Sequence, residues 1–348
     1  MELSKSDIKA TKGLAILFML FLHLFCRTDI NGLYNVSLTI NGKPFIYYLA
    51  LFCDACVPIY LFCSGYGLYS SNSKQSLNFT KNLIRIMKLM VNYWIILIIF
   101  ISIGFIAGKG ELFPGSAGKF LSNFFLFSSS YCGAWWFLQT YVILAFLSPI
   151  IIKLVNKYRC TLLISISLVV YLLSYIQHIK HALYFGDNKI IILAINAVIL
   201  VGSSQLSFIV GCIAVKHKIY SRLYEKAHNL KLKNIFCLIG ILLLIVIHSL
   251  YESMIIAPFT GIVFMFIFNL MNKTSSVQKT LNYFGEHSTN IWLTHMFFYM
   301  IIFPKLVFAP KYPILIFPWL IILCLVSSYL INVIYKPILH FINKKVVF

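Results

Sequence analysis

Ten apolar runs, each close to the length that crosses a membrane, are the feature that most constrains the fold of this 348-residue chain. A membrane-spanning helix needs about 20 apolar residues, because roughly 30 Å of hydrocarbon is crossed at about 1.5 Å per residue. The expected spans are 11–26, 45–69, 88–107, 135–152, 161–177, 190–215, 234–250, 253–271, 283–303 and 313–335. Only 11% of the residues are charged, whereas soluble domains usually carry about 25%. The sequence therefore predicts an all-α membrane protein, a polytopic bundle of about ten transmembrane helices.

The basic residues indicate how such a bundle is oriented. With the N-terminus in the cytoplasm, 21 of the 29 Lys and Arg residues fall on the cytoplasmic side and 8 on the opposite side. Because cytoplasmic loops carry the excess of Lys and Arg, both termini are expected to be cytoplasmic. These loops also account for the net charge of +20. The lipid bilayer is therefore the expected partner, and binding of nucleic acid is not expected. The segment 120–130 is too short to cross. A single domain over residues 1–348 is expected, with no appended soluble domain.

Polar side chains inside the spans are candidates for function, because an ionisable group at mid-membrane costs roughly 2–4 kcal/mol or more. His23 follows Lys12 by eleven residues, a rise of about 16 Å along a helix, which places a cation near one membrane face and an imidazole about halfway across. His295 is expected at a similar depth on another span, and Asp54 is the only acidic residue well inside a span. A hydrogen bond between helices is the alternative explanation for each of the three residues. Asp54 is also a candidate to orient a histidine.

A second group of candidates lies at the expected cytoplasmic ends of the first three spans. Lys12, Arg85 and Lys88 are cations that either anchor these helices or bind a polyanion such as a phosphate group. The stretch Ser64-Gly65-Tyr66 lies toward the inner end of the second span. The nine cysteines lie mostly in or beside apolar runs, so they are interpreted as small packing residues, and no metal site is expected.

These residues, in this order, resemble the acyltransferase-3 family of bacterial membrane acyltransferases. Lys12 and His23 match the Arg-x10-His pattern of its first span, with Lys in place of Arg. The remaining matching segments are 57–66, ending in Ser-Gly-Tyr; 81–94, which carries Arg85 and has Asn82 where the family has an Arg; 135–149, which begins Trp135-Trp136-Phe-Leu; and 284–295, which ends at His295.

The resemblance implies a stand-alone enzyme of the bacterial cytoplasmic membrane. It implies transfer of an acyl group, most often acetyl, from cytoplasmic acyl-coenzyme A to a hydroxyl of an envelope polysaccharide or its lipid-linked precursor, with no bound cofactor. His23 is the expected general base or acyl carrier, assisted by Asp54 and His295. Lys12, Arg85, Lys88, Ser64, Gly65, Tyr66 and Trp136 are expected to contact substrate.

Other functions remain open at this stage. A transporter or flippase of envelope lipid or polysaccharide would need no acyl donor, but the inverted repeats and broken helices typical of transporters are not evident in the sequence. A structural or sensory subunit would use His23 for stability rather than chemistry. The donor acyl group, succinyl or acetyl, the acceptor sugar and the oligomeric state cannot be predicted from these residues.

Overall fold

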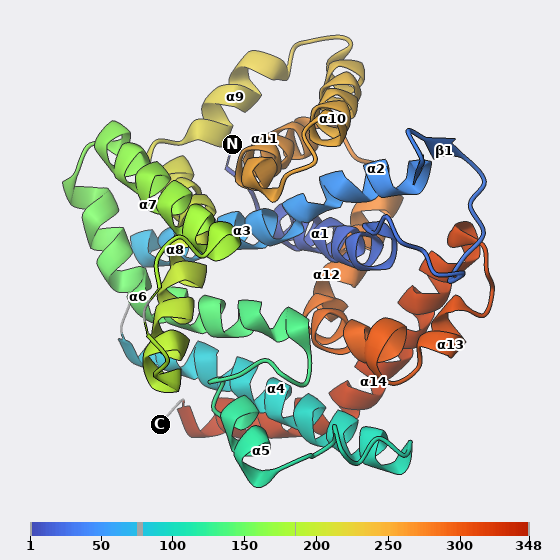
Figure 1. Ribbon diagram of the computed structural model, residues 1–348. Helices are drawn as coiled ribbons and strands as arrows, with labels where there is room; N and C mark the ends of the chain where they lie inside the picture. Colours follow the sequence, from blue (N-terminus) through green and yellow to red (C-terminus); the bar gives the residue numbers. More distant parts are fainter. Residues whose placement is uncertain (1, 75–78, 185, 347–348) are drawn as a thin grey trace. The chain divides into compact units, whose positions relative to one another are not determined.

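Two compact units, both almost wholly helical, make up the protein in a computed structural model that describes residues 2–74, 79–184 and 186–346 (Figure 1). Unit 1 comprises Met1–Thr28, Leu38–Asn78 and Ile143–Glu286, and unit 2 comprises Asp29–Ser37, Phe79–Val142 and His287–Phe348. The helices α6 (Trp136–Lys157) and α12 (Ser275–Met296) each contribute residues to both units. The expectation of a single domain over the whole chain stays a prediction.

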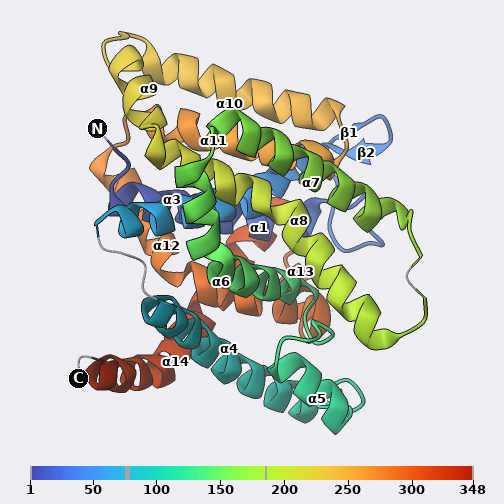
Figure 2. The same cartoon turned by 90° about the vertical axis from the view of Figure 1, so that its left-hand side faces the viewer.

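Unit 1 contains the larger number of helices. Its further elements are α1 (Lys5–Phe25), β1 (Thr39–Ile40), β2 (Lys43–Pro44), α2 (Phe45–Phe52), the 3₁₀-helix η1 (Cys53–Ala55), α3 (Cys56–Lys74), α7 (Cys160–Lys180), α8 (Lys189–Lys216), α9 (Ile219–Ala227), α10 (Lys233–Leu250), the 3₁₀-helix η3 (Met254–Ile256) and α11 (Ala257–Leu270). Within it, α8 packs against α3 and α7, and α10 packs against α11; both pairings α7–α8 and α10–α11 are visible in Figure 2.

Unit 2 has fewer helices in its described residues. Its elements are α4 (Phe79–Ile106), α5 (Ala117–Phe124), the 3₁₀-helix η2 (Gly133–Trp135), the π-helix η4 (Phe297–Ile301), α13 (Pro304–Phe308) and α14 (Pro313–Val346). The helix α4 packs against α14, and the Phe100 ring of α4 stacks on Phe297 with ring centroids 4.5 Å apart. The C-terminal part of α12 therefore belongs to the same packed group as α4 and α14.

All ten expected spans are helical, and the all-α membrane fold is confirmed. Eight helices of the described chain are long and apolar enough to cross a membrane. The expected span 253–271 is a shorter apolar helix, and the span 283–303 is formed by the end of α12 and the π-helix. Polar residues such as Glu286, His287 and Asn290 explain why α12 is not recognised by hydropathy alone. The segment 120–130, expected not to cross, contains only the end of the short helix α5.

The start of α1 is fixed by local hydrogen bonds. The Ser4 hydroxyl accepts from the Asp7 backbone N–H, and the Asp7 carboxylate accepts from the Ser4 backbone N–H at 2.9 Å. This reciprocal capping box satisfies two backbone donors at the helix terminus. The sequence Ser-x-x-Asp thus determines where the helix carrying Lys12 and His23 begins.

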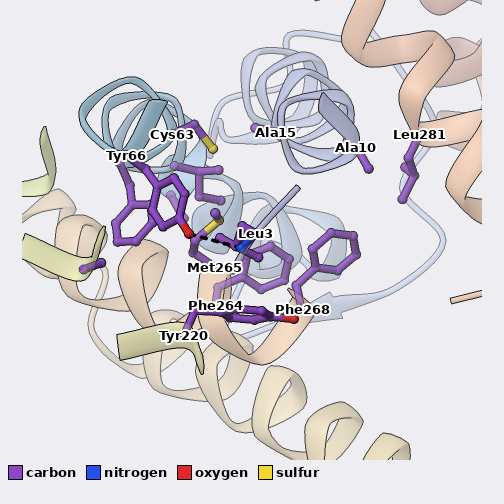
Figure 3. Packing of buried hydrophobic residues seen from close by; sticks show 14 of the residues in the cluster. Leu3, Ala10, Ala15, Cys63, Tyr66, Tyr220, Phe264, Met265, Phe268 and Leu281 are labelled. Carbon is purple, nitrogen blue, oxygen red and sulfur yellow. Dashed lines mark hydrogen bonds between the residues drawn. The ribbon is translucent and has the colours of Figure 1, made fainter. Parts of the chain in front are cut away.

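Glycines allow α3 and α8 to approach closely. A Cβ atom built on Gly65 would overlap the carbonyl oxygen of Phe208 on α8, and one built on Gly211 would overlap that of Phe62 on α3. Small residues permit such contact between membrane helices, where packing replaces the hydrophobic effect. Beside this contact lies a cluster of buried apolar side chains that includes Tyr66 (Figure 3).

A break interrupts the second expected span, which the sequence analysis treated as one unbroken helix. The 3₁₀-turn η1 separates α2 from α3, and Asp54 lies in it. Pro58 supplies the physical reason, since its ring clashes with the carbonyl of the residue four positions earlier in an α-helix, and that residue is Asp54. The 3₁₀-turn that includes Met254 precedes Pro258 in the same way.

A short hairpin precedes this span. The turn Asn41-Gly42 has positive φ at both residues, 49° and 73°, as the tight turn between two strands requires. Lys43 forms an ion pair with Glu252, which also accepts a 2.8 Å hydrogen bond from the Tyr47 hydroxyl. These two contacts, the one from Lys43 first, lower the pKa of the Glu252 carboxyl. The ion pair therefore ties the hairpin to the loop after α10.

Exposed apolar faces on several helices are consistent with a lipid environment. On α10 the side chains of Leu242, Leu243, Val246 and Ile247 are more than half exposed, and α14 exposes a similar row that includes Val333. Soluble proteins rarely expose continuous apolar patches of this extent. These faces are what the acyl chains of a bilayer cover.

Candidate functional site

The predicted site residues divide between the two units. Unit 1 holds Lys12, His23, Asp54, Ser64, Gly65 and Tyr66, whereas unit 2 holds Arg85, Lys88, Trp136 and His295.

In unit 1, one uninterrupted helix carries both Lys12 and His23. Eleven residues of α1 separate them, which is a rise of about 16 Å. Both side chains are half-buried. The charge of Lys12 acts on Cys63, so its ammonium group lies near α3, and its carbonyl accepts a 3.0 Å hydrogen bond from the Tyr60 hydroxyl. The spacing expected from the sequence therefore exists in the folded helix.

Arg27 is a neighbour of His23 that sequence reasoning counted only as an outer loop residue. Its guanidinium donates a 3.4 Å hydrogen bond to the His23 carbonyl oxygen, four residues earlier. Arginine stays protonated in proteins, so a permanent positive charge lies at the end of α1 beside His23. Such a charge can stabilise an anion that forms during a reaction. The signal available in the sequence was the position of Arg27, four residues after His23 and just beyond the end of the span.

Asp54 lies near the same end of α1. The turn η1 packs against α1, and Cys26, at the C-terminus of that helix, is within electrostatic reach of the Asp54 carboxylate. Within the part of the chain that the structure describes, Asp54 Oδ2 is buried and has no hydrogen-bond partner. An unpaired buried carboxylate oxygen is costly, so its presence at a helix break favours a functional role.

Ser64, Gly65 and Tyr66 each have a structural partner in unit 1. The Ser64 hydroxyl donates to the Tyr60 carbonyl of its own helix at 2.7 Å, and Gly65 gives α3 and α8 their close contact. The Tyr66 hydroxyl accepts from the Leu3 backbone N–H at 3.1 Å, as Figure 3 shows, and donates to the Glu2 carboxylate. These contacts explain the three residue types without a ligand, and their expected role in substrate binding stays a prediction.

In unit 2, His295 is fully buried two residues before the π-helix begins. Its Nδ1 lies 2.7 Å from the carbonyl oxygen of Trp292, and its ring stacks on Tyr299. A carbonyl oxygen only accepts hydrogen bonds, so Nδ1 carries the proton and Nε2 holds the lone pair in the neutral ring. The adjoining π-helix is a feature that often marks functional sites.

Tryptophans of the Trp135-Trp136 pair have different roles. Trp135 Nε1 donates to the Leu293 carbonyl at 3.0 Å, and the Ala134 carbonyl accepts from Trp292 Nε1 at 3.2 Å. Trp135 therefore holds the last turn of α12, which carries His295. Trp136, the residue predicted to contact substrate, is half-buried and packs against Phe137.

Arg85 and Lys88 lie on α4, three residues apart. Arg85 is exposed, and its guanidinium donates to Asn82 Oδ1 at 3.4 Å. The Lys88 side chain is half-buried, and its carbonyl accepts a hydrogen bond from the Tyr335 hydroxyl of α14. Both cations remain candidates for binding a phosphate group.

Sequence reasoning missed a buried polar network in unit 2. Asn92 of α4 donates through Nδ2 to Asn290 Oδ1 at 2.7 Å, and Asn290 Nδ2 donates to Ser328 Oγ of α14 at 2.9 Å. His287 Nδ1 lies 2.8 Å from the same Ser328 hydroxyl. All four side chains are buried. The signal in the sequence was their polarity within otherwise apolar runs.

No group of three or more His, Cys, Asp and Glu side chains that could hold a metal ion occurs among the described residues.

The fold and these intramembrane polar groups define a polytopic α-helical membrane protein. The chain belongs to the acyltransferase-3 family, whose model, described as an acyltransferase domain, matches residues 5–333. This match confirms the resemblance found in the sequence motifs and supports a membrane acyltransferase activity. Comparisons with curated proteins and with solved structures gave no match.

Proposed function

We propose that this protein is an O-acyltransferase of the bacterial cytoplasmic membrane. In this proposal it moves an acyl group, most often acetyl, from cytoplasmic acyl-coenzyme A to a hydroxyl of an envelope polysaccharide or of its lipid-linked precursor. The family supports acyl transfer. The observation that carries the proposal is the single helix that holds Lys12 and His23 about 16 Å apart. That rise matches a donor whose phosphates stay near the membrane surface while its thioester reaches the interior.

His23 is the proposed general base. A sugar hydroxyl is a poor nucleophile, and a base that removes its proton during attack accelerates the reaction by about 10²–10⁴-fold. The hydroxyl oxygen forms a bond to the thioester carbonyl carbon while His23 takes the proton, which gives a tetrahedral oxyanion. The carbon–sulfur bond then breaks, and the coenzyme A thiolate receives the proton. A variant of this route, in which His23 carries the acyl group as an acyl-imidazole, has the same residue requirement.

The other polar groups of the candidate site have separate proposed roles. Arg27 stabilises the oxyanion, and Asp54 stabilises the protonated form of His23. His295 in its neutral form accepts a hydrogen bond through Nε2, since its Nδ1 proton is bound to Trp292 O. Donation to an oxyanion, the role expected from the sequence, would require the protonated ring. Lys12, Arg85 and Lys88 are the proposed phosphate-binding residues.

The test uses labelled acetyl-coenzyme A and membranes that contain the protein and lipid-linked host glycan. We expect wild type to place label in an alkali-labile ester and His23→Ala to lose at least about 100-fold of this activity at matched abundance. His248→Ala is the matched control, because His248 is another histidine of unit 1, its Nδ1 lies 3.3 Å from the Thr260 hydroxyl, and it has no proposed part in the chemistry. Equal labelling by wild type and His23→Ala would remove His23 from the mechanism.

A transporter or flippase of envelope lipid or polysaccharide is the second candidate. The broken helix at Cys53–Ala55 favours it, because transporters often bind substrate where a membrane helix is interrupted. Transport would continue after acyl-coenzyme A is removed, and no labelled ester would form from acetyl or succinyl donors. Measuring glycan export with and without the donor separates the two functions.

A further inference from the structure

The buried polar network of Asn92, Asn290 and Ser328, the amide ladder, lies in unit 2 between α4, α12 and α14. Two contacts show how α4 runs relative to the segment after His287. Asn92 meets Asn290, and eight residues later Phe100 stacks on Phe297. The two helical segments therefore run parallel and nearly in register.

One polar atom of the ladder makes no hydrogen bond with the described residues. Asn92 is 4% exposed, and its Nδ2 donates to Asn290, but its Oδ1 is buried without a hydrogen-bond partner among the described residues. Leaving a buried acceptor unsatisfied costs roughly 1–3 kcal/mol. An apolar residue would fill the same space without this cost. The unmet acceptor therefore indicates a ligand that brings a hydrogen-bond donor to this level of the membrane.

The position of the ladder narrows the choice of ligand. Arg85 and Lys88 precede Asn92 by seven and four residues and lie on the same side of α4, so Arg85 is about 10 Å from it along the axis. His295 follows Asn290 by five residues, a rise of about 7.5 Å. Cations therefore lie at one end, an imidazole at the other, and amides in the interval, within a total rise of about 18 Å.

We propose that the amide ladder recognises the secondary amides of the pantetheine arm of acyl-coenzyme A. This inference rests on the proposed function, because it takes acyl-coenzyme A to be the donor. A pantetheine amide N–H would donate to Asn92 Oδ1, since every amide in a membrane interior needs a partner. The ladder lies where the middle of a donor would be if its phosphates met Arg85 and Lys88 and its thioester reached the level of His295.

The alternative is that the ladder only holds the three helices together, as polar side chains do in many membrane bundles. Thioesters of graded composition distinguish the two roles. S-acetyl-pantetheine carries two amides, whereas an S-acetyl alkyl thiol carries none. For wild type we expect a clear preference for the first, measured as kcat/KM of labelled transfer. In Asn92→Leu the preference should fall roughly tenfold, because one hydrogen bond to the donor is lost.

Two further variants distinguish loss of donor recognition from loss of folded protein. Ser328→Ala removes one hydroxyl of the ladder with little change in volume. It should also reduce the preference for S-acetyl-pantetheine over the S-acetyl alkyl thiol. Asn269→Leu removes an equally buried asparagine of unit 1, whose Nδ2 bonds to Thr11 and Met265, and should lower abundance without altering the preference. Equal losses with both thioesters in Asn92→Leu and Ser328→Ala would show that the ladder is purely structural, and would overturn the inference.

A binding measurement on purified protein needs neither acceptor nor turnover. Coenzyme A contains the arm, and adenosine 3′,5′-diphosphate lacks it. Wild type should be stabilised against heat more by coenzyme A than by the diphosphate, and Asn92→Leu should lose this difference. A retained difference would overturn the inference while leaving the proposed function intact. Failure of wild type to use any thioester would instead remove the proposed function, and the inference with it.

Discussion

Replacing His295 by two different amides separates its structural hydrogen bond from its chemistry. In His295→Asn the side-chain NH₂ group occupies the place of Nδ1, so the bond to the Trp292 carbonyl, now 2.7 Å long, can persist while Nε2 is lost. In His295→Gln the polar end reaches the place of Nε2, and the bond to Trp292 is lost. The two variants therefore remove opposite halves of one imidazole.

The expected magnitudes follow from what each variant removes. His295→Asn should reduce acyl transfer by about 10²–10⁴-fold if Nε2 takes part in proton transfer. Its stability should change by less than about 1 kcal/mol, because the bond to Trp292 is kept. His295→Gln should be destabilised by roughly 1–3 kcal/mol, since a buried carbonyl loses a donor.

Labelled transfer at matched abundance measures the first effect, and thermal unfolding in detergent measures the second. If His295→Asn keeps half or more of the wild-type rate, Nε2 has no part in the chemistry. If His295→Asn is destabilised as much as His295→Gln, the assignment of the proton to Nδ1 is wrong.

Three other predictions concern unit 1. Asp54→Asn should raise the free energy of unfolding, because a carboxylate whose Oδ2 is buried without a hydrogen-bond partner among the described residues becomes neutral, yet reduce acyl transfer at least about tenfold; a variant less stable than wild type, or one with full activity, contradicts this. Gly65→Ala should destabilise by about 1–3 kcal/mol through overlap with α8, whereas Gly67→Ala, with open space around it, should stabilise by about 0.5–1 kcal/mol; thermal unfolding decides whether the signs differ. Glu252→Gln should remove about 0.2–1 kcal/mol, the contribution of the ion pair with Lys43. The pKa of Glu252 is lowered in the fold, so this difference is present above the unfolded-state value of about 4.3 and disappears as pH falls through the folded-state value; a difference unchanged at pH 3 refutes the assignment.

Hydropathy predicted the helices, because bilayer thickness imposes a length on every span. The spacing of the motifs predicted the family. The break at Asp54 was not predicted, although Pro58 signals it, because the expectation for this span rested on its apolar length alone. The ladder of Asn92, Asn290 and Ser328 was missed for a different reason. Its members lie far apart in sequence, and only packing of α4, α12 and α14 brings them into contact.

Lysine and histidine at a spacing of eleven were predictable because one helix carries both and its rise is fixed. The surroundings of His23 were not: Arg27 bonds to its carbonyl beyond the end of the hydropathy pattern. The tautomer of His295 likewise depends on a backbone carbonyl three residues earlier, which sequence does not report.

The π-helix at Phe297–Ile301 has a consequence for how chain length can vary. A π-turn is equivalent to an α-helix with one residue inserted, and each residue of an α-helix turns the chain by about 100°. A one-residue deletion within 297–301 would absorb that insertion and leave everything before it, His295 included, in register. The same deletion earlier in α12 would rotate His295 away from its neighbours. Single-residue deletions should therefore be tolerated in this five-residue segment and not in the helix that leads to it.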